Sequence, residues 1–215
     1  MNNKTNHIAL LGGSGYIGQT FIECALKRGI RIKALTRSSE KLRTYEDKIE
    51  IITGSLFNET DLSNLVADTN AVVSLAGPPL SGKFEIEDYT NGMRKLIKVM
   101  QEQDVRRIIN IAGASVKLPN ETFVKKKAMI RAVARLIISK AVKTKDIELE
   151  MLSSSNLNWT TLRPGFVKKH KQGQLIVDNN KLCSFSVDKE QLATFILDCM
   201  ENSSWEAKAP FVATV

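Results

Sequence analysis

The residues best suited to chemistry form a glycine-rich run near the start of the chain, LLGGSGYIG at residues 10–18. An apolar β-type segment precedes this run and an amphipathic helical segment follows it, which is the setting of a dinucleotide-binding turn. Gly12 would permit a sharp turn, Gly15 the close approach of a diphosphate, and Gly18 close packing of helix on strand. Backbone amides near residues 14–17, at the positive end of the helix, would bind the phosphates. We therefore predict coenzyme contacts from Gly12, Ser14, Gly15, Tyr16 and Ile17, against the alternative of a turn that is merely rich in glycine.

The residue expected to meet the adenine-side ribose is an arginine. NAD sites usually carry an acid about 20 residues after the glycines. Here Arg37 follows the second apolar segment, 19 residues after Gly18. Its guanidinium fork would bind a 2′-phosphate, with a hydroxyl from Ser38 and charge from Lys41 or Arg43 nearby. The sequence thus predicts NADP(H) as the coenzyme, with NAD(H) as the alternative, unless Arg37 only caps the next helix.

The elements that must position these residues alternate between short apolar strands and amphipathic helices. The expected strands are His7–Leu11, Arg31–Thr36, Glu50–Thr53, Ala71–Leu75, Arg107–Ile111 and Trp159–Arg163. The expected helices are Gly15–Arg28, Asn58–Ala67, Asp88–Gln103, Thr122–Ser153 and Lys189–Glu201. Such alternation predicts an α/β fold: a Rossmann-type doubly wound parallel sheet in one domain over residues 1–215, with a small C-terminal substrate-side region.

Two segments carry more specific expectations. In the long fourth helix, an apolar stripe should pack against the sheet. The stripe comprises Ile130, Val133, Ala134, Ile137 and Ala141. Near the C-terminus, Leu175–Val177 and Lys181–Phe185 are expected to form a pair of strands, and Pro210–Ala213 a last short strand.

Composition limits the classes of partner. The chain of 215 residues has a net charge of +8, with basic clusters at 125–145 and 168–171. Few aromatic residues interleave with these clusters, so a basic surface, part of which attracts a phosphate-bearing coenzyme, is favoured over nucleic-acid binding. Three cysteines, the lack of a secretory leader and the lack of an apolar run of about 20 residues indicate a cytoplasmic protein without a membrane segment. The sequence leaves the oligomeric state open.

The spacing Gly-x-x-Gly-x-x-Gly, with the additional Gly13, resembles the extended and atypical short-chain dehydrogenase/reductase superfamily. The resemblance spans residues 8 to about 200. Thr53–Leu56 is similar to that superfamily's adenine-side Gly-Asp-hydrophobic element, with serine in place of the aspartate. Ala76–Pro79 resembles its turn beneath the nicotinamide-side ribose. Leu162–Gly165 resembles its Leu-Arg-Pro-Gly element. The resemblance implies further coenzyme contacts from Ser55, Leu56, Ala76, Gly77, Pro78, Ala112, Gly113, Pro164, Gly165 and Phe166.

The superfamily's Tyr-x-x-x-Lys acid/base pair is absent, because no lysine stands four residues after Tyr16, Tyr45 or Tyr89. By alignment with the Leu-Arg-Pro-Gly element, the tyrosine position falls near Ala141 and the lysine position near Lys145. The catalytic serine position falls on Gly113, and Ser115 is the nearest hydroxyl. Lys145 and Ser115 are therefore the catalytic candidates, with a solvated lysine and a loop hydroxyl as the alternatives.

The missing pair argues against carbonyl–alcohol interconversion and favours hydride transfer to a conjugated acceptor such as a flavin, quinone or linear tetrapyrrole. There the coenzyme supplies the hydride and solvent can supply the proton. The pattern resembles the atypical subgroup that contains flavin/biliverdin reductase B and NmrA-like proteins. Two alternatives remain: a non-catalytic NADP(H)-binding redox sensor that contacts a protein partner through residues 125–145, and an epimerase or dehydratase with relocated acid/base groups. No metal site is expected, because His7 and His170 stand far apart and no zinc-type spacing occurs.

Overall fold

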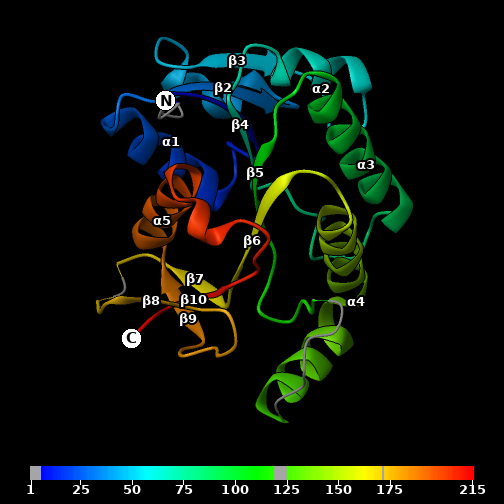
Figure 1. The fold of residues 1–215 in the computed structure, drawn as a ribbon, viewed down its shortest axis with the longest axis vertical. Helices are drawn as coiled ribbons and strands as arrows, with labels where there is room; N and C mark the ends of the chain where they lie inside the picture. The colour runs from blue at the N-terminus through cyan, green and yellow to red at the C-terminus, as the bar shows by residue number, and fades with distance from the viewer. Residues whose placement is uncertain (1–5, 119–124, 171) are drawn as a thin grey trace.

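The computed structural model describes residues 6–118, 125–170 and 172–215, without the side chains of residues 125–131, 133 and 135. Its centre is an eight-stranded sheet in the order β3-β2-β1-β4-β5-β6-β10-β8 (Figure 1). The strands are β1 (His7–Leu11), β2 (Arg31–Thr36), β3 (Glu50–Thr53), β4 (Ala71–Ser74), β5 (Arg107–Ile111), β6 (Asn158–Pro164), β8 (Leu175–Asp178) and β10 (Phe211–Thr214). All neighbours pair in parallel except β8, which runs antiparallel to β10. The predicted doubly wound Rossmann-type sheet is confirmed.

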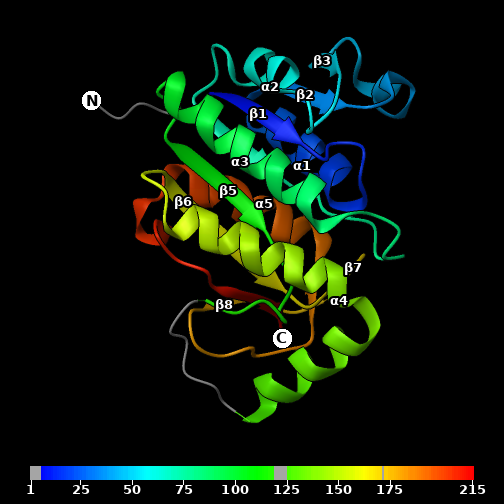
Figure 2. The same cartoon turned by 90° about the vertical axis from the view of Figure 1, so that its right-hand side faces the viewer.

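Helices cover both faces of this sheet, as a parallel sheet with two apolar faces requires (Figures 1 and 2). On one face lie α1 (Tyr16–Lys27) and α5 (Lys189–Glu201), which share a core with the strands through Phe21 and Ile196. On the other lie α2 (Glu59–Val66), α3 (Ile86–Glu102) and α4 (Lys125–Ser153), which bury Leu62, Leu96 and Leu149. Two 3-10 turns that the sequence pattern did not predict are η1 (Ser39–Tyr45) and η2 (Ser203–Trp205).

Side-chain caps fix where two of these helices begin. The Asn58 side chain caps α2 by accepting hydrogen bonds from the amides of Thr60 and Asp61, at 2.9 and 3.2 Å. Asp188 accepts from the amides of Glu190 and Gln191 in the same way, at 2.8 and 3.0 Å. Both caps orient the start of a helix relative to the strand end that precedes it.

The long helix α4 is kinked at Ile138, whose φ and ψ of −132° and 43° are not helical. The residues before the kink lead away from the body of the protein in both views (Figures 1 and 2). The predicted apolar stripe is therefore wrong at Ile137, which is 74% exposed, although Ala141 beyond the kink is buried. Ile130, Val133 and the basic residues Lys125, Lys126, Lys127, Arg131 and Arg135 lie outside the described side chains.

The C-terminal region pairs differently from the prediction. Lys181–Phe185 is not a strand; instead β7 (Phe166–Lys168) and β9 (Ser186–Asp188) form a small parallel sheet, and β8 pairs with β10. The reason is a close backbone approach at Gly165, where a Cβ would lie 2.3 Å from the carbonyl oxygen of Phe185. The amide of Phe166 donates to the same oxygen at 2.8 Å. Long-range pairing thus prevails over the local hairpin.

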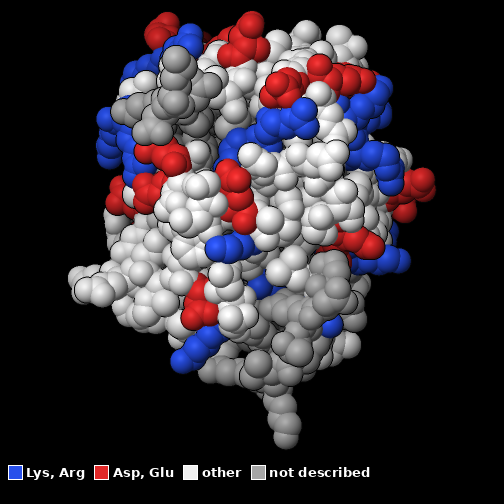
Figure 3. Space-filling model, in the orientation of Figure 1, with Lys and Arg blue, Asp and Glu red and all other residues white. Residues whose placement is uncertain are grey.

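On the face shown in Figure 3, lysine and arginine side chains are interspersed with aspartate and glutamate rather than gathered in one patch. None of the helices in the described ranges is long and apolar enough to cross a bilayer.

Candidate coenzyme site

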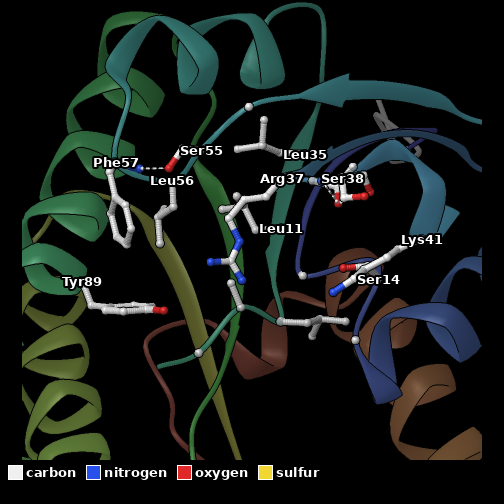
Figure 4. A pocket seen from close by; sticks show the side chains of 17 residues that line it. Leu11, Ser14, Leu35, Arg37, Ser38, Lys41, Ser55, Leu56, Phe57 and Tyr89 are labelled. Carbon is white, nitrogen blue, oxygen red and sulfur yellow. Dashed lines mark hydrogen bonds between the residues drawn. The ribbon is translucent and has the colours of Figure 1, made fainter. Parts of the chain in front are cut away.

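The site lies where the strand order reverses, between β1 and β4. The segments after these strands lead to helices on opposite faces, α1 and α3, and so leave a crevice at the carboxyl ends of the strands. A cavity of about 340 Å³ opens there (Figure 4). Its lining residues are Leu11, Gly12, Ser14, Gly15, Leu35, Thr36, Arg37, Ser38, Lys41, Gly54, Ser55, Leu56, Phe57, Leu75, Ala76, Gly77 and Tyr89.

The glycine-rich turn forms one wall of this cavity. Gly12 has a φ of +81°, and a Cβ on it would lie 2.6 Å from the amide nitrogen of Ala76. A Cβ on Gly18 would lie 2.2 Å from the carbonyl oxygen of Gly12, so Gly18 packs against the turn itself and not against the strand as expected. Only glycine fits at either position.

The start of α1 supplies donors for a diphosphate. Gly15 is the N-cap residue and makes no side-chain cap, so the first amides of the helix, those of Tyr16, Ile17 and Gly18, have no acceptor within the helix. The amide of Gly15 donates to the carbonyl of Gly12 at 3.0 Å and is not one of these donors. The first amides and the glycine cradle together fit a dinucleotide diphosphate.

Arg37 and its neighbours form the end of the cavity beside β2. The Thr36 hydroxyl donates to the carbonyl of Ser38 at 3.0 Å and accepts from its amide at 3.3 Å, which holds the turn in place. From this turn the exposed Arg37 side chain extends into the cavity (Figure 4). Lys41 lines the same end. Two cations and a hydroxyl thus line this end of the cavity.

The turn after β3 is held by an acid from the next helix. The Asp61 carboxylate accepts the amide of Ser55 at 2.8 Å, and a Cβ on Gly54 would lie 2.6 Å from that carboxylate. The Ser55 hydroxyl in turn accepts the amide of Phe57 at 3.2 Å. These bonds leave Leu56 directed into the cavity (Figure 4). Asp61 therefore holds the turn that carries Leu56.

An aromatic wall completes the cavity, and the sequence did not reveal it. The Tyr89 ring packs edge-on against Phe57, at 5.3 Å between centroids, and against Phe84 at 5.2 Å. Tyr89 comes from α3 and directs its hydroxyl into the cavity (Figure 4). In the sequence, Tyr89 could be considered only for a Tyr-x-x-x-Lys pair, because its place in the cavity depends on how α3 packs.

Lys145 lies beneath the turn after β4 and is not a solvated surface residue. Its Nζ donates to the carbonyl of Ala76 at 2.9 Å and to Oε2 of Glu148 at 2.7 Å. The two side chains are only 11% and 3% exposed. Lys145 thus reaches the cavity through Ala76 and not by lining it.

The Ser115 hydroxyl lies beside the position of the missing serine at residue 113. Its Oγ lies 3.5 Å from the point that a Cβ on Gly113 would occupy, and the residue is 9% exposed. The segment around it is fastened to β6, because the amide of Ala114 donates to the carbonyl of Pro164 at 2.8 Å.

The other predicted residues do not line this cavity. The Tyr16 ring is 55% exposed and lies under Nζ of Lys189, at 4.5 Å from the ring centroid. Pro164 is buried, and Phe166 is 74% exposed. The predicted coenzyme contacts outside the cavity lining are Tyr16, Ile17, Pro78, Ala112, Gly113, Pro164, Gly165 and Phe166.

A doubly wound sheet with a glycine turn at its switch point defines a Rossmann-type dinucleotide-binding protein. The chain belongs to the NAD(P)H-binding family, whose model matches residues 12–203. This match confirms NAD(P)H as the coenzyme and the resemblance to the short-chain dehydrogenases/reductases.

Individual relatives agree with this family. A sterol-4-alpha-carboxylate 3-dehydrogenase (decarboxylating) of Mus musculus is 26% identical over 118 residues, covering 53% of this chain and 32% of that enzyme. The chain spans about a third of the length of this and two other dehydrogenases that it matches.

Solved structures share the fold over nearly the whole chain. A short-chain dehydrogenase/reductase from Veillonella parvula in complex with NADP has a TM-score of 0.79 at 18% identity, covering 97% of this chain and 94% of that one. ChuY, described as an anaerobillin reductase from Escherichia coli O157:H7, has a TM-score of 0.80 at 15% identity and covers 97% of both chains.

Proposed function

We propose that this protein is an NADPH-dependent reductase that transfers hydride to a flat conjugated acceptor such as a flavin, a quinone or a linear tetrapyrrole. Bound NADPH supplies the hydride. The residues of the chain hold the coenzyme and orient the acceptor, and solvent or the Ser115 hydroxyl delivers the proton.

This proposal rests on the residues found at the two positions of the Tyr-x-x-x-Lys acid/base pair. The tyrosine position is Ala141, which is buried, and the lysine at position 145 is engaged with Ala76 and Glu148. The three tyrosines lie elsewhere: Tyr89 in the cavity wall, Tyr45 donating to Glu23 at 3.1 Å, and Tyr16 beside Lys189. Carbonyl reduction needs a positioned acid, whereas a conjugated ring spreads the charge that hydride transfer creates.

The loops beyond the cavity support a flat apolar acceptor. Phe166, Phe185 and Leu80 are 74%, 47% and 69% exposed. Phe166 and Phe185 are joined by a backbone hydrogen bond of 2.8 Å. Aromatic rings of this kind offer faces and edges on which a planar acceptor can stack. The structural neighbour ChuY, described as an anaerobillin reductase, is consistent with such an acceptor.

The preference for NADPH rests on Arg37, Ser38 and Lys41 at the β2 end of the cavity. Together they provide positive charge and donors where a 2′-phosphate would lie, and no carboxylate lines the described cavity to repel it.

The test is NADPH oxidation by the purified protein, followed by loss of nicotinamide absorbance with FMN, riboflavin and a soluble quinone as acceptors. We expect steady turnover that is faster with NADPH than with NADH. Tight NADPH binding with no turnover on any acceptor would contradict the reductase and favour the redox-sensing regulator with a protein partner.

A further inference from the structure

We propose that Glu148 is a positioning residue of the coenzyme site, acting through Lys145 on the nicotinamide half of the coenzyme. This inference rests on the proposed coenzyme role of Lys145. Glu148 lies outside the cavity, and no sequence motif pointed to it.

Glu148 and Lys145 form a buried ion pair within one helix. Glu148 and Lys145 are three residues apart on α4, so their side chains lie on the same side of the helix. Their polar atoms are 2.7 Å apart. Because the carboxylate is 3% exposed and the ammonium 11%, water does little to screen or replace this contact.

Lys145 is connected to the cavity through Ala76, which lines it. An ammonium has three N–H donors, of which Glu148 takes one and the carbonyl of Ala76 takes another, at 2.9 Å. Ala76 is also in backbone contact with the glycine turn, since a Cβ on Gly12 would lie 2.6 Å from its amide nitrogen. The backbone of Ala76 thus lies between Gly12, on its amide side, and Lys145, on its carbonyl side.

The position of Ala76 in the sheet indicates which half of the coenzyme lies near it. Arg37 follows β2 and Ala76 comes after β4, and these strands flank β1 on opposite sides. A dinucleotide that crosses the β1 turn with its 2′-phosphate at Arg37 therefore brings its nicotinamide half over Ala76 and Gly77. Lys145 therefore acts on that half through its hydrogen bond to the carbonyl of Ala76.

Glu148 consequently does two things. It balances the charge of an ammonium that has little access to water, and it fixes the Lys145 side chain so that another of its donors stays on the carbonyl of Ala76. With glutamine at position 148 the ammonium loses its opposite charge, and the hydrogen bond that the amide oxygen can still accept is weaker and holds Lys145 less firmly.

The test measures dissociation constants for NADPH and for adenosine 2′,5′-bisphosphate, which carries only the half that meets Arg37. With Glu148→Gln we expect NADPH to bind about tenfold more weakly and the bisphosphate within about twofold of the wild type. Equal weakening of both ligands, or no change in NADPH affinity, would overturn the proposal, because a merely structural role acts on both halves alike.

A double-mutant cycle tests the route through Lys145. Glu148→Gln added to Lys145→Met should cause no further loss of NADPH affinity, and an additive loss would show that Glu148 acts independently. The matched control is Asp198→Asn, which breaks a 2.8 Å ion pair with Arg28 on the opposite face of the sheet and should leave NADPH affinity within about twofold.

A second variant covers the case in which Glu148→Gln does not fold. Replacing both Lys145 and Glu148 by methionine removes the buried charges together, which is often neutral for stability. This variant should also lose NADPH affinity and keep bisphosphate affinity; wild-type affinity for both would overturn the proposal. These readouts are of binding, so a wild type that binds NADPH but reduces no acceptor would refute only the proposed reductase.

Discussion

The amide nitrogen of Ala76 lies 2.6 Å from the point that a Cβ on Gly12 would occupy, so the turn after β1 and the turn after β4 are in backbone contact. These are the two turns on either side of the switch point. This close approach requires the hydrogen that glycine carries in place of a side chain. A side chain at position 12 would have to separate them.

Gly12→Ala should therefore abolish measurable NADPH binding and lower the melting temperature. Its φ of +81° costs a residue with a side chain about 1–2 kcal/mol, and the backbone clash adds to that cost. Gly29→Ala is the matched control, because its φ is +70° but nothing lies within 4 Å of the new Cβ. It should lose stability only, with NADPH affinity unchanged in calorimetry. Wild-type affinity in Gly12→Ala would contradict the cradle.

Arg37→Gln should convert a preference for NADPH into near-indifference between the two coenzymes. Removing a guanidinium from a phosphate costs about 1.5–3 kcal/mol, or roughly 10- to 100-fold in the NADPH dissociation constant, and should leave that of NADH within about threefold. Arg43→Gln is the control, since Arg43 is exposed, pairs with Glu40 at 3.6 Å and does not line the cavity. Equal effects on both coenzymes would show that Arg37 does not read the 2′-phosphate.

The sequence was informative wherever local chemistry decides the structure. Eight of the nine expected strands were predicted to within a residue at each end, because such strands are short, apolar and bounded by turns. The sequence also predicted that Gly12 and Arg37 lie in one site, because each follows a strand and the carboxyl ends of parallel strands lie at the same edge of a doubly wound sheet.

What the sequence did not reveal depends on contacts between distant segments. Tyr89 reaches the cavity only through the packing of α3, and Glu148 matters only because α4 carries Lys145 beneath Ala76. The kink at Ile138 has no proline or glycine to mark it. The pairing of β7 with β9 likewise depends on the approach of Phe185 to Gly165.

Cys199 should resist alkylation until the protein unfolds. Burial raises the pKa of its thiol to about 12, partly offset by the nearby charge of Arg107. The thiolate is the reactive form, so at about pH 9 roughly 0.1% of this thiol can react, whereas most of an ordinary exposed thiol can. In a pulse of iodoacetamide read by peptide mass spectrometry, Cys183 should be labelled first. Labelling of native Cys199 at a similar rate would contradict the buried environment.

The same pKa shift sets the sign of a pH effect on stability. In the unfolded chain the Cys199 thiol ionises near its ordinary pKa of about 8.5, whereas in the folded chain it holds its proton up to about pH 12. The unfolded state is therefore favoured progressively as pH rises through this window. Cys199→Ala should flatten the alkaline fall in melting temperature. An unchanged slope would mean that other groups cause it.

Ser115→Ala should lower kcat/KM for a conjugated acceptor by less than about tenfold, because solvent can deliver the proton, whereas loss of a true general acid costs about 10²- to 10⁴-fold. Gly113→Ser offers the reciprocal change: its Cβ would lie 3.5 Å from the Ser115 hydroxyl, an ordinary contact, so the side chain fits. In the Ser115→Ala background it should restore the small loss by placing a hydroxyl in the same space. A fall beyond about 100-fold in Ser115→Ala, rescued by Gly113→Ser, would instead make this hydroxyl the proton donor and reopen carbonyl reduction as the reaction.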